Sequence, residues 1–324
     1  MATGIVSIAA KLVGFPLLPE ALFGLNLLFY PLLWVLTVLR ALKHGDELVA
    51  DLSHHGRAVG FFTMVAATCV LGSQWVVIAE ARPIAAVLFW FGILLYVALV
   101  YSVFAMLTVK EQKPSLPEGI NGGWLVSVVA AQSVSVLGTQ LAGFFEHPER
   151  VLFFSLVMWL GGGMLYFWII ALIFYRYTFF TLAPSDLAPP YWINMGAAAI
   201  STLAGSLLST ANEQSAVLTA VLPFVRGLTL MWWATATWWI PMLLVLGLWR
   251  HVYRRFPLRY DPLYWGGVFP LGMYTAATIR LSHALDAPFI LPIARVFFYV
   301  AGAAWLLAFA GMLAHLWQSR LKRA

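Results

Sequence analysis

The chain has 324 residues, of which 62% are hydrophobic and only 10% charged, and its formal net charge is +6. An ordinary soluble domain has about 25% charged residues, so this composition excludes a soluble globular protein and indicates an integral protein of the cell membrane, inner or plasma. The single cysteine, Cys69, excludes a disulfide framework and a thiolate metal cluster, and its place in an apolar run favours a buried, inert thiol.

Apolar runs of about 20 residues, the length that crosses roughly 30 Å of hydrocarbon, recur along the whole chain. Cutting them where charged residues, Pro and Gly cluster predicts one polytopic domain, residues 1–324, with ten transmembrane helices at approximately 1–15, 19–43, 57–80, 83–109, 123–146, 148–181, 191–211, 217–250, 263–285 and 289–319. The first range rises only about 22 Å. We therefore expect that it is half-buried against its neighbours, or that the true start lies upstream of Met1.

The basic residues predict the orientation of these helices. Of the 19 Lys and Arg residues, most fall in the 2–3, 4–5, 6–7 and 8–9 connections and at the C-terminus: Arg40, Lys43, Arg57, Lys110, Lys113, Arg176, Arg250, Arg254, Arg255, Arg259, Arg320, Lys322 and Arg323. Because cytoplasmic loops carry the excess of Lys and Arg, we expect both termini in the cytoplasm. A nucleic-acid patch in "HVYRRFPLRY" is a weaker interpretation than contact with anionic lipid, so we expect a lipid bilayer and no nucleic acid as partner.

A weak internal period indicates a repeated helical hairpin, used about five times. Trp124, Trp192 and Trp265 each open an odd-numbered range after a polar loop, and the third range begins at Arg57. Small residues are concentrated in the odd-numbered ranges and bulky aromatic residues in the even-numbered ones. Small residues let helices approach closely and aromatic residues suit lipid, so we expect odd helices inside and even helices outside. Tight packing of a solid bundle is the alternative.

Polar side chains lie in the expected inner helices. Gln132 and Gln140 are eight residues apart, which we take to place them close to one helix face, Asn194 opens the seventh range, and Gln74 closes the third. An unsatisfied amide in hydrocarbon costs several kcal/mol, so each should face another helix or water. Hydrogen bonds between helices explain any one of them, whereas together they suggest a mildly polar, almost uncharged axis that would hold an anion weakly enough to release it.

Three stretches carry a resemblance to a known family. "MATGIVSIA" at the start, "PPYWINMGAAAIS" at Pro189–Ser201 and "YWGGVFPLGMYTAAT" at Tyr264–Thr278 resemble the tellurite-resistance/C4-dicarboxylate transporter (TDT) family, which includes plant slow-type anion channels. The resemblance implies ten helices as five hairpins around a central pore, kinked inner helices, a homotrimer with one pore per subunit, and a phenylalanine that blocks the pore. Residue matching places that phenylalanine at Phe269, with Trp265 as the tryptophan of the motif. The first inner helix departs from the pattern because it has no proline within it.

The ninth range combines several features that weaken a helix. Gly266 and Gly267 lower helix stability and Pro270 removes a hydrogen bond, so we expect a bend near Phe269 in a helix that lines the pore. The residues predicted on one face, in order towards the non-cytoplasmic end, are Phe269, Met273, Ala276 and Arg280. The stripe suggests a gate followed by a cation that attracts anions. Packing of Phe269 in the core, and snorkelling of Arg280 to the interface, are the alternatives.

Other motifs are missing from the sequence. The seven histidines show no i, i+4 pair, so we expect no metal site and no cofactor. The sequence lacks a nucleotide-binding loop and a nucleophile elbow, and no Asp or Glu lies at the middle of a predicted span. An intramembrane enzyme is therefore the weaker alternative, and catalytic residues are not predicted.

These observations predict an anion channel or transporter with a phenylalanine-gated pore. A coupled secondary carrier for dicarboxylates or sulfite is the alternative to a channel. The sequence leaves the anion open among C4-dicarboxylate, sulfite, tellurite and small inorganic anions such as chloride and nitrate, because selectivity depends on pore radius and field strength.

Overall fold

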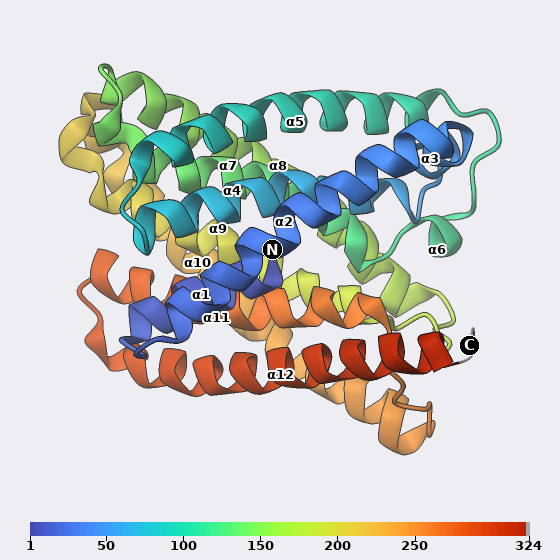
Figure 1. The fold of residues 1–324 in the computed structure, drawn as a ribbon. Helices are drawn as coiled ribbons and strands as arrows, with labels where there is room; N and C mark the ends of the chain where they lie inside the picture. Colours follow the sequence, from blue (N-terminus) through green and yellow to red (C-terminus); the bar gives the residue numbers. More distant parts are fainter. Residues whose placement is uncertain (322–324) are drawn as a thin grey trace.

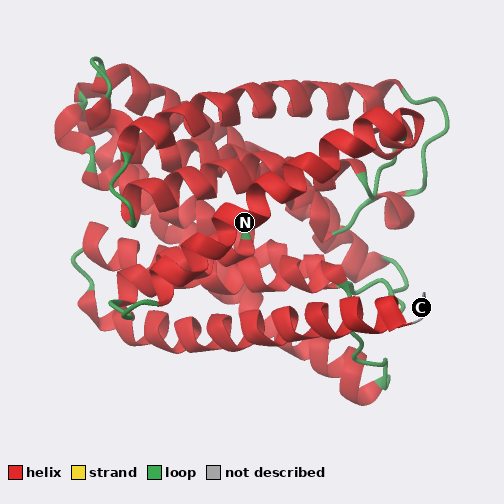
Figure 2. Ribbon diagram, viewed as in Figure 1, coloured by secondary structure: helices red, strands yellow, loops and turns green. Residues whose placement is uncertain are grey.

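The computed structural model describes residues 1–321, and within them it is all-helical (Figures 1 and 2). Five helices are mostly buried: α1 (Ala2–Val13), α4 (Phe62–Val77), α7 (Val126–Leu141), α9 (Ile193–Thr210) and α11 (Trp265–Ala284). Each is followed by a longer helix that packs against it: α2 (Leu18–Lys43), α5 (Arg82–Val109), α8 (Pro148–Phe179), α10 (Ala216–Leu248) and α12 (Leu291–Leu321). Two short helices, α3 (Gly45–Leu52) and α6 (Leu116–Gly119), lie in connections where the sequence predicted none.

The buried helices form a closed ring. Around it α1 packs against α4, α4 against α7, α7 against α9, α9 against α11, and α11 against α1. The longer helices lie outside the ring. In the most apolar stretch of α7 94% of residues are buried, whereas in that of α2 only 17% are. The predicted division into inner and outer helices therefore agrees with the structure, and the exposed apolar side chains of the outer helices suit contact with lipid.

Seven helices are long and apolar enough to cross a membrane: α2, α5, α8, α10 and α12, and α4 and α7 together with the 3₁₀ turns next to them. The helix α1 has 12 residues, which is too short, and it starts part-way along the bundle (Figure 1). The helices α9 and α11 are rich in Gly, Ala, Ser and Thr, and neither is among these seven helices. The five inner and five outer helices overlap the ten predicted ranges along the chain. That all ten cross the membrane, as five hairpins, stays a prediction.

Four of the inner helices begin with a 3₁₀ turn, which the sequence did not predict. The turns are Ala58–Phe61, Gly122–Leu125, Pro189–Trp192 and Pro262–Tyr264. They lie at the end of the bundle that carries the longer connections and the C-terminus (Figure 2). The repeated turn strengthens the predicted internal period.

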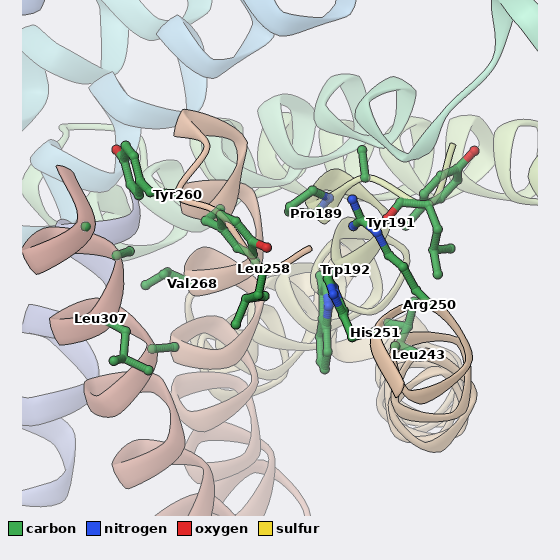
Figure 3. Close-up of a pocket in the computed structure, with 18 of the residues that line it drawn as sticks. Pro189, Tyr191, Trp192, Leu243, Arg250, His251, Leu258, Tyr260, Val268 and Leu307 are labelled. Atoms are coloured by element: carbon green, nitrogen blue, oxygen red, sulfur yellow. Dashed lines mark hydrogen bonds between the residues drawn. The ribbon is translucent and has the colours of Figure 1, made fainter. Parts of the chain in front are cut away.

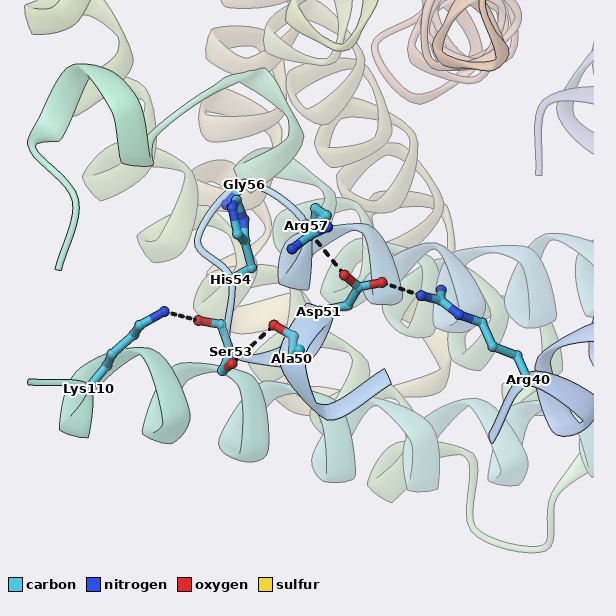
Figure 4. A network of polar contacts seen from close by, with 8 residues as sticks. All are labelled: Arg40, Ala50, Asp51, Ser53, His54, Gly56, Arg57 and Lys110. Atoms are coloured by element: carbon cyan, nitrogen blue, oxygen red, sulfur yellow. Dashed lines mark hydrogen bonds and ion pairs between the residues drawn. The ribbon is translucent and has the colours of Figure 1, made fainter. Parts of the chain in front are cut away.

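Ion pairs hold the connections at this end. Asp51 of α3 accepts a hydrogen bond from Arg40 of α2 and forms an ion pair with Arg57, whose Nε atom lies 3.0 Å away, and the Lys110 Nζ atom donates to the Ser53 carbonyl at 3.0 Å (Figure 4). Three of the predicted topogenic cations thus also fasten α2, α3 and α5 together.

Arg176 has a different place from the one that the sequence predicted. It lies in the last turn of α8, not in a connection, and only 6% of it is exposed. Its guanidinium donates to the Pro117 carbonyl and the Tyr191 hydroxyl and pairs with Asp186. Lys322 and Arg323 lie outside the described residues.

Candidate functional site

The ring encloses a small cavity, with a volume of about 20 Å³, to which all five inner helices contribute. A cavity of roughly 10–15 Å³ already holds one water molecule. The lining residues are Ile5, Ile8 and Leu12 of α1, Cys69, Val70, Ser73 and Val77 of α4, Ser133, Val136 and Gln140 of α7, Ile200 and Leu203 of α9, and Met273 and Arg280 of α11. The inner helices run in the same direction, and most of these residues lie in their C-terminal halves, so the cavity occupies one half of the ring.

The lining of this cavity is mildly polar and carries one cation. Arg280 is half-buried, and within residues 1–321 it forms no ion pair. The Gln140 Oε1 atom is buried and finds no hydrogen-bond partner among the described residues. No acidic side chain belongs to the lining that the structure describes. The cavity can therefore offer an anion the Arg280 guanidinium, with no carboxylate to repel it, whereas the Gln140 oxygen is an acceptor that suits a water molecule.

Several buried hydroxyl groups of the inner helices are satisfied within their own helices. Ser133 donates to the Val129 carbonyl at 2.7 Å, and Ser201, Thr202 and Thr275 donate to the carbonyls four residues earlier. Of these residues Ser133 lines the cavity, where its back-bonded hydroxyl adds a weak dipole to the wall.

Phe269 lies one helical turn before Met273 and is fully buried. It is absent from the lining of the cavity, which includes Met273. The helix α11 continues through Pro270, whose ring fits against Gly196 of α9: a Cβ atom at Gly196 would lie 2.7 Å from the Pro270 Cγ atom. On the other side of α11, Gly272 gives the same close approach to Ile5 and Val6 of α1. Phe269 therefore belongs to the tightly packed half of the ring, next to the cavity.

Two of the predicted polar pore residues face the outer layer. The Gln132 Nε2 atom donates to the Trp159 carbonyl of α8 at 3.0 Å, and the Asn194 Nδ2 atom lies 3.4 Å from the Tyr177 hydroxyl of α8. Neither lines the cavity. The nitrogen of each amide thus contacts α8, whereas Gln132 Oε1 and Asn194 Oδ1 are buried without a partner among the described residues, so a role of these two residues in the pore stays a prediction.

The remaining predicted residues of α11 lie outside the cavity. Gly266 faces Pro190 and Gly267 faces Trp192, and at both positions an added Cβ atom would make only ordinary contacts, at 3.6 and 3.8 Å. Ala276 is buried and is absent from the cavity lining. The predicted bend at Phe269 stays a prediction.

Several residues that line the cavity were not predicted, although their spacing in the sequence indicates them. In four inner helices the lining includes a pair of residues seven apart: Ile5 and Leu12, Val70 and Val77, Ser133 and Gln140, and Met273 and Arg280. A step of seven residues returns close to the same face of a helix. The pair that contains Arg280 was recognised, and the other three could have been found by the same spacing.

Comparison with known proteins supports a transport role. Residues 1–313 match the family described as voltage-dependent anion channel, SLAC1. An uncharacterized membrane protein of Mycobacterium tuberculosis is 41% identical over 147 residues, which cover 45% of this chain and 74% of the relative. An uncharacterized transporter of Methanocaldococcus jannaschii is 25% identical, covering 86% of this chain and 81% of the relative. A sulfite efflux pump of Trichophyton rubrum is 25% identical, covering 96% of this chain and 87% of the relative.

The family match covers nearly the whole chain. It agrees with the resemblance that the three sequence stretches show. The chain is an integral membrane protein that belongs to the SLAC1/TDT family of anion channels and transporters.

Proposed function

We propose that this chain conducts a small anion across the cell membrane along the axis of the inner ring. The observation that carries the proposal is the cavity that all five inner helices line, with Arg280 and Gln140 in its wall and no acidic side chain in the described lining. A weak dipolar site with one cation attracts anions and still releases them, which conduction requires.

In this proposal Phe269 closes the path. Its fully buried ring lies one turn beyond Met273, in the half of the ring where Pro270 and Gly272 hold α11 tightly against α9 and α1. An apolar ring in a narrow pore excludes water as well as ions, so the barrier depends on the volume of the side chain.

Sulfite is the first anion to test, because a relative that aligns with 96% of this chain is a sulfite efflux pump. C4-dicarboxylate, tellurite, chloride and nitrate follow. Purified protein in liposomes with a set voltage separates the two mechanisms: a current proportional to the driving force indicates a channel, and saturable flux with a fixed stoichiometry indicates a coupled carrier. No flux of any of these anions would refute the proposal.

The proposal includes ten membrane-spanning helices arranged as five hairpins, both termini in the cytoplasm, and a homotrimer with one pore in each subunit. The single cysteine, Cys69, is fully buried, so the wild-type protein is a suitable background for labelling. In intact cells an impermeant thiol reagent should label Glu213→Cys and leave Lys113→Cys unlabelled. The opposite pattern would reverse the orientation, and a transport-competent monomer of 35.9 kDa would refute the trimer.

A further inference from the structure

A second and larger cavity lies outside the ring, behind α11. Its volume is about 580 Å³, within the roughly 300–1,000 Å³ that ligand pockets occupy. Its walls come from α10, α11, α12 and the two connections that precede α9 and α11 (Figure 3). Leu258 and Leu307, which line it, are 76% and 75% exposed. The cavity therefore opens on the outer, lipid-facing side of the bundle.

One end of this cavity is cationic. Arg250, His251 and Arg259 line it, and no acidic side chain does so among the described residues. Arg250 and His251 belong to a π-helical turn, Trp249–Tyr253, that ends α10. Such turns shift the register of side chains and occur often at functional sites. Here the turn places two basic side chains next to each other on the cavity wall.

The guanidinium of Arg250 is fixed and only partly satisfied. Its Nη1 atom donates to the Leu187 carbonyl at 2.5 Å, and its Cζ atom lies 4.4 Å from the centre of the Phe256 ring. Its Nε atom is buried and has no hydrogen-bond partner among the described residues. The Nη2 atom also has no partner among the described residues and is not buried, so this fixed arginine has a preorganised donor for a phosphate oxygen.

The rest of the cavity is apolar. Leu243 and Gly247 of α10, Leu271 of α11 and Ala308 of α12 line it, and aromatic side chains of Trp192 and Tyr264 lie towards the basic end. Aromatic and basic residues together are typical of the membrane interface, and small aliphatic residues are typical of the hydrocarbon layer. The two ends of the cavity thus match the two parts of an anionic phospholipid.

We propose that this cavity binds an anionic phospholipid, with its phosphate at Arg250 and one acyl chain between α10 and α12. The occupant contacts Gly267, Val268 and Leu271 on the face of α11 that is turned away from the ring axis. Val268 precedes Phe269 directly, so the lipid supports the helix that carries the proposed gate.

Native mass spectrometry of the purified full-length protein tests binding without any transport measurement. The protein is incubated with phosphatidylglycerol or with phosphatidylcholine of the same acyl chains. We expect selective retention of phosphatidylglycerol, lowered about tenfold by Arg250→Gln, as for the loss of one hydrogen bond to a charged group. Arg226→Gln, an exposed arginine of the same helix, is the matched control and should retain the lipid like the wild type.

A second variant fills the apolar end and keeps every charge. A Cβ atom at Gly247 meets nothing within 4 Å, and the same is true of Gly227, which lies in α10 away from the cavity. Both positions therefore accept a side chain without a clash at the backbone. Gly247→Leu should lose phosphatidylglycerol, and Gly227→Leu should keep it. Added phosphatidylglycerol should raise the melting temperature of the wild type and of Gly227→Leu, and it should not raise that of Gly247→Leu.

Four results would overturn the proposal. Equal retention of phosphatidylcholine, which has the same phosphate but no net charge, would remove the preference for an anionic lipid, and unchanged retention in Gly247→Leu would remove the acyl-chain site. If inorganic phosphate alone raised the melting temperature as much as the lipid, the ligand would be a free anion. If Gly247→Leu instead converted an oligomer into monomers, the cavity would be a protein interface. Binding is measured here directly, so its failure is distinguishable from a failure of anion transport.

Discussion

The two halves of the inner ring are built differently. The half formed by the C-terminal ends of the inner helices contains the cavity with Ser73, Gln140 and Arg280 in its wall. In the other half glycines allow direct contact between backbones and rings, as at Gly196 with Pro270, and Phe269 is fully buried. In the proposed function, one half collects anions and the other half holds the barrier to them.

If the proposed function holds, this difference makes attraction and closure separate properties of the ring. They depend on different residues of the same helix, α11, about 16 Å apart along its axis at 1.5 Å per residue. Substitutions in the closed half should therefore change the stability of the protein and the leak of anions through it. Substitutions at the cavity should change the anion flux and the dependence of that flux on salt.

The largest effect is expected at Gly122, where the turn before α7 touches the turn before α9. A Cβ atom there would lie 2.5 Å from the Pro190 carbonyl oxygen and 2.6 Å from the Tyr191 Cα atom, and a backbone cannot move aside as a side chain can. Gly122→Ala should destabilise the protein by about 3 kcal/mol, the upper part of the usual range for overpacking. Thermal unfolding in detergent measures it. The control is Gly60→Ala in the turn before α4, where a Cβ atom meets nothing within 4 Å.

Gly196→Ala should have the next largest effect. The added Cβ atom would lie 2.7 Å from the Pro270 Cγ atom, so the rigid proline ring beside Phe269 has to shift. We expect a loss of about 1–3 kcal/mol and a leak of anions through the closed half. Gly267→Ala, with its nearest contact at 3.8 Å, should be neutral or slightly stabilising and should not leak. If Gly196→Ala and Gly267→Ala had the same stability and the same leak, the contact between α11 and α9 would have no part in closing the pore.

Arg280→Gln should lower anion flux and leave stability nearly unchanged. A cation at the mouth of a cavity concentrates anions by about tenfold or more at low salt, and screening removes the effect. Flux into liposomes at about 0.01 M and about 0.15 M salt measures it, because the Debye length falls from roughly 30 Å to roughly 8 Å between them. Arg295→Gln, an exposed cation at the start of α12, is the control. If Arg280→Gln had the same flux as the wild type at low salt, Arg280 would be an interface anchor and would not attract anions to the pore.

The smallest effects separate the two glutamines of α7. Gln132→Leu removes a hydrogen bond to α8 and should cost about 0.6 kcal/mol of stability, the average for interhelical hydrogen bonds in a membrane, with unchanged flux. Gln140→Leu removes an amide from the cavity and should lower flux with little change in stability. If Gln132→Leu lost flux and Gln140→Leu did not, Gln132 would be the pore residue and Gln140 the residue that joins two helices.

Much of the ring could be predicted from composition. Gly, Ala, Ser and Thr permit close helix packing, so their concentration in alternate segments indicated which helices are inside. The direction of single side chains could not be predicted in the same way. Gln132 and Gln140, eight residues apart, point about 80° away from each other on a helix of 3.6 residues per turn, which is enough to send one to α8 and the other to the cavity.

The larger cavity had no signal in the sequence. It depends on the path of the connection after α10 and on the π-helical turn that ends that helix, and neither follows from hydropathy or from the spacing of small residues. The basic run there indicated contact with anionic lipid only in general terms. That Arg250 is fixed by the Leu187 carbonyl, 63 residues earlier in the chain, required the structure.

Anion flux through Phe269→Ala, normalised to folded protein and measured beside its thermal stability, tests the central claim most directly. If Phe269 closes the path, the variant conducts more than the wild type, Phe269→Leu lies between them, and the melting temperature changes little. If Phe269 is a packing residue, its loss costs about 3–5 kcal/mol, as for a core phenylalanine. A destabilised variant that conducts no more than the wild type would contradict the account.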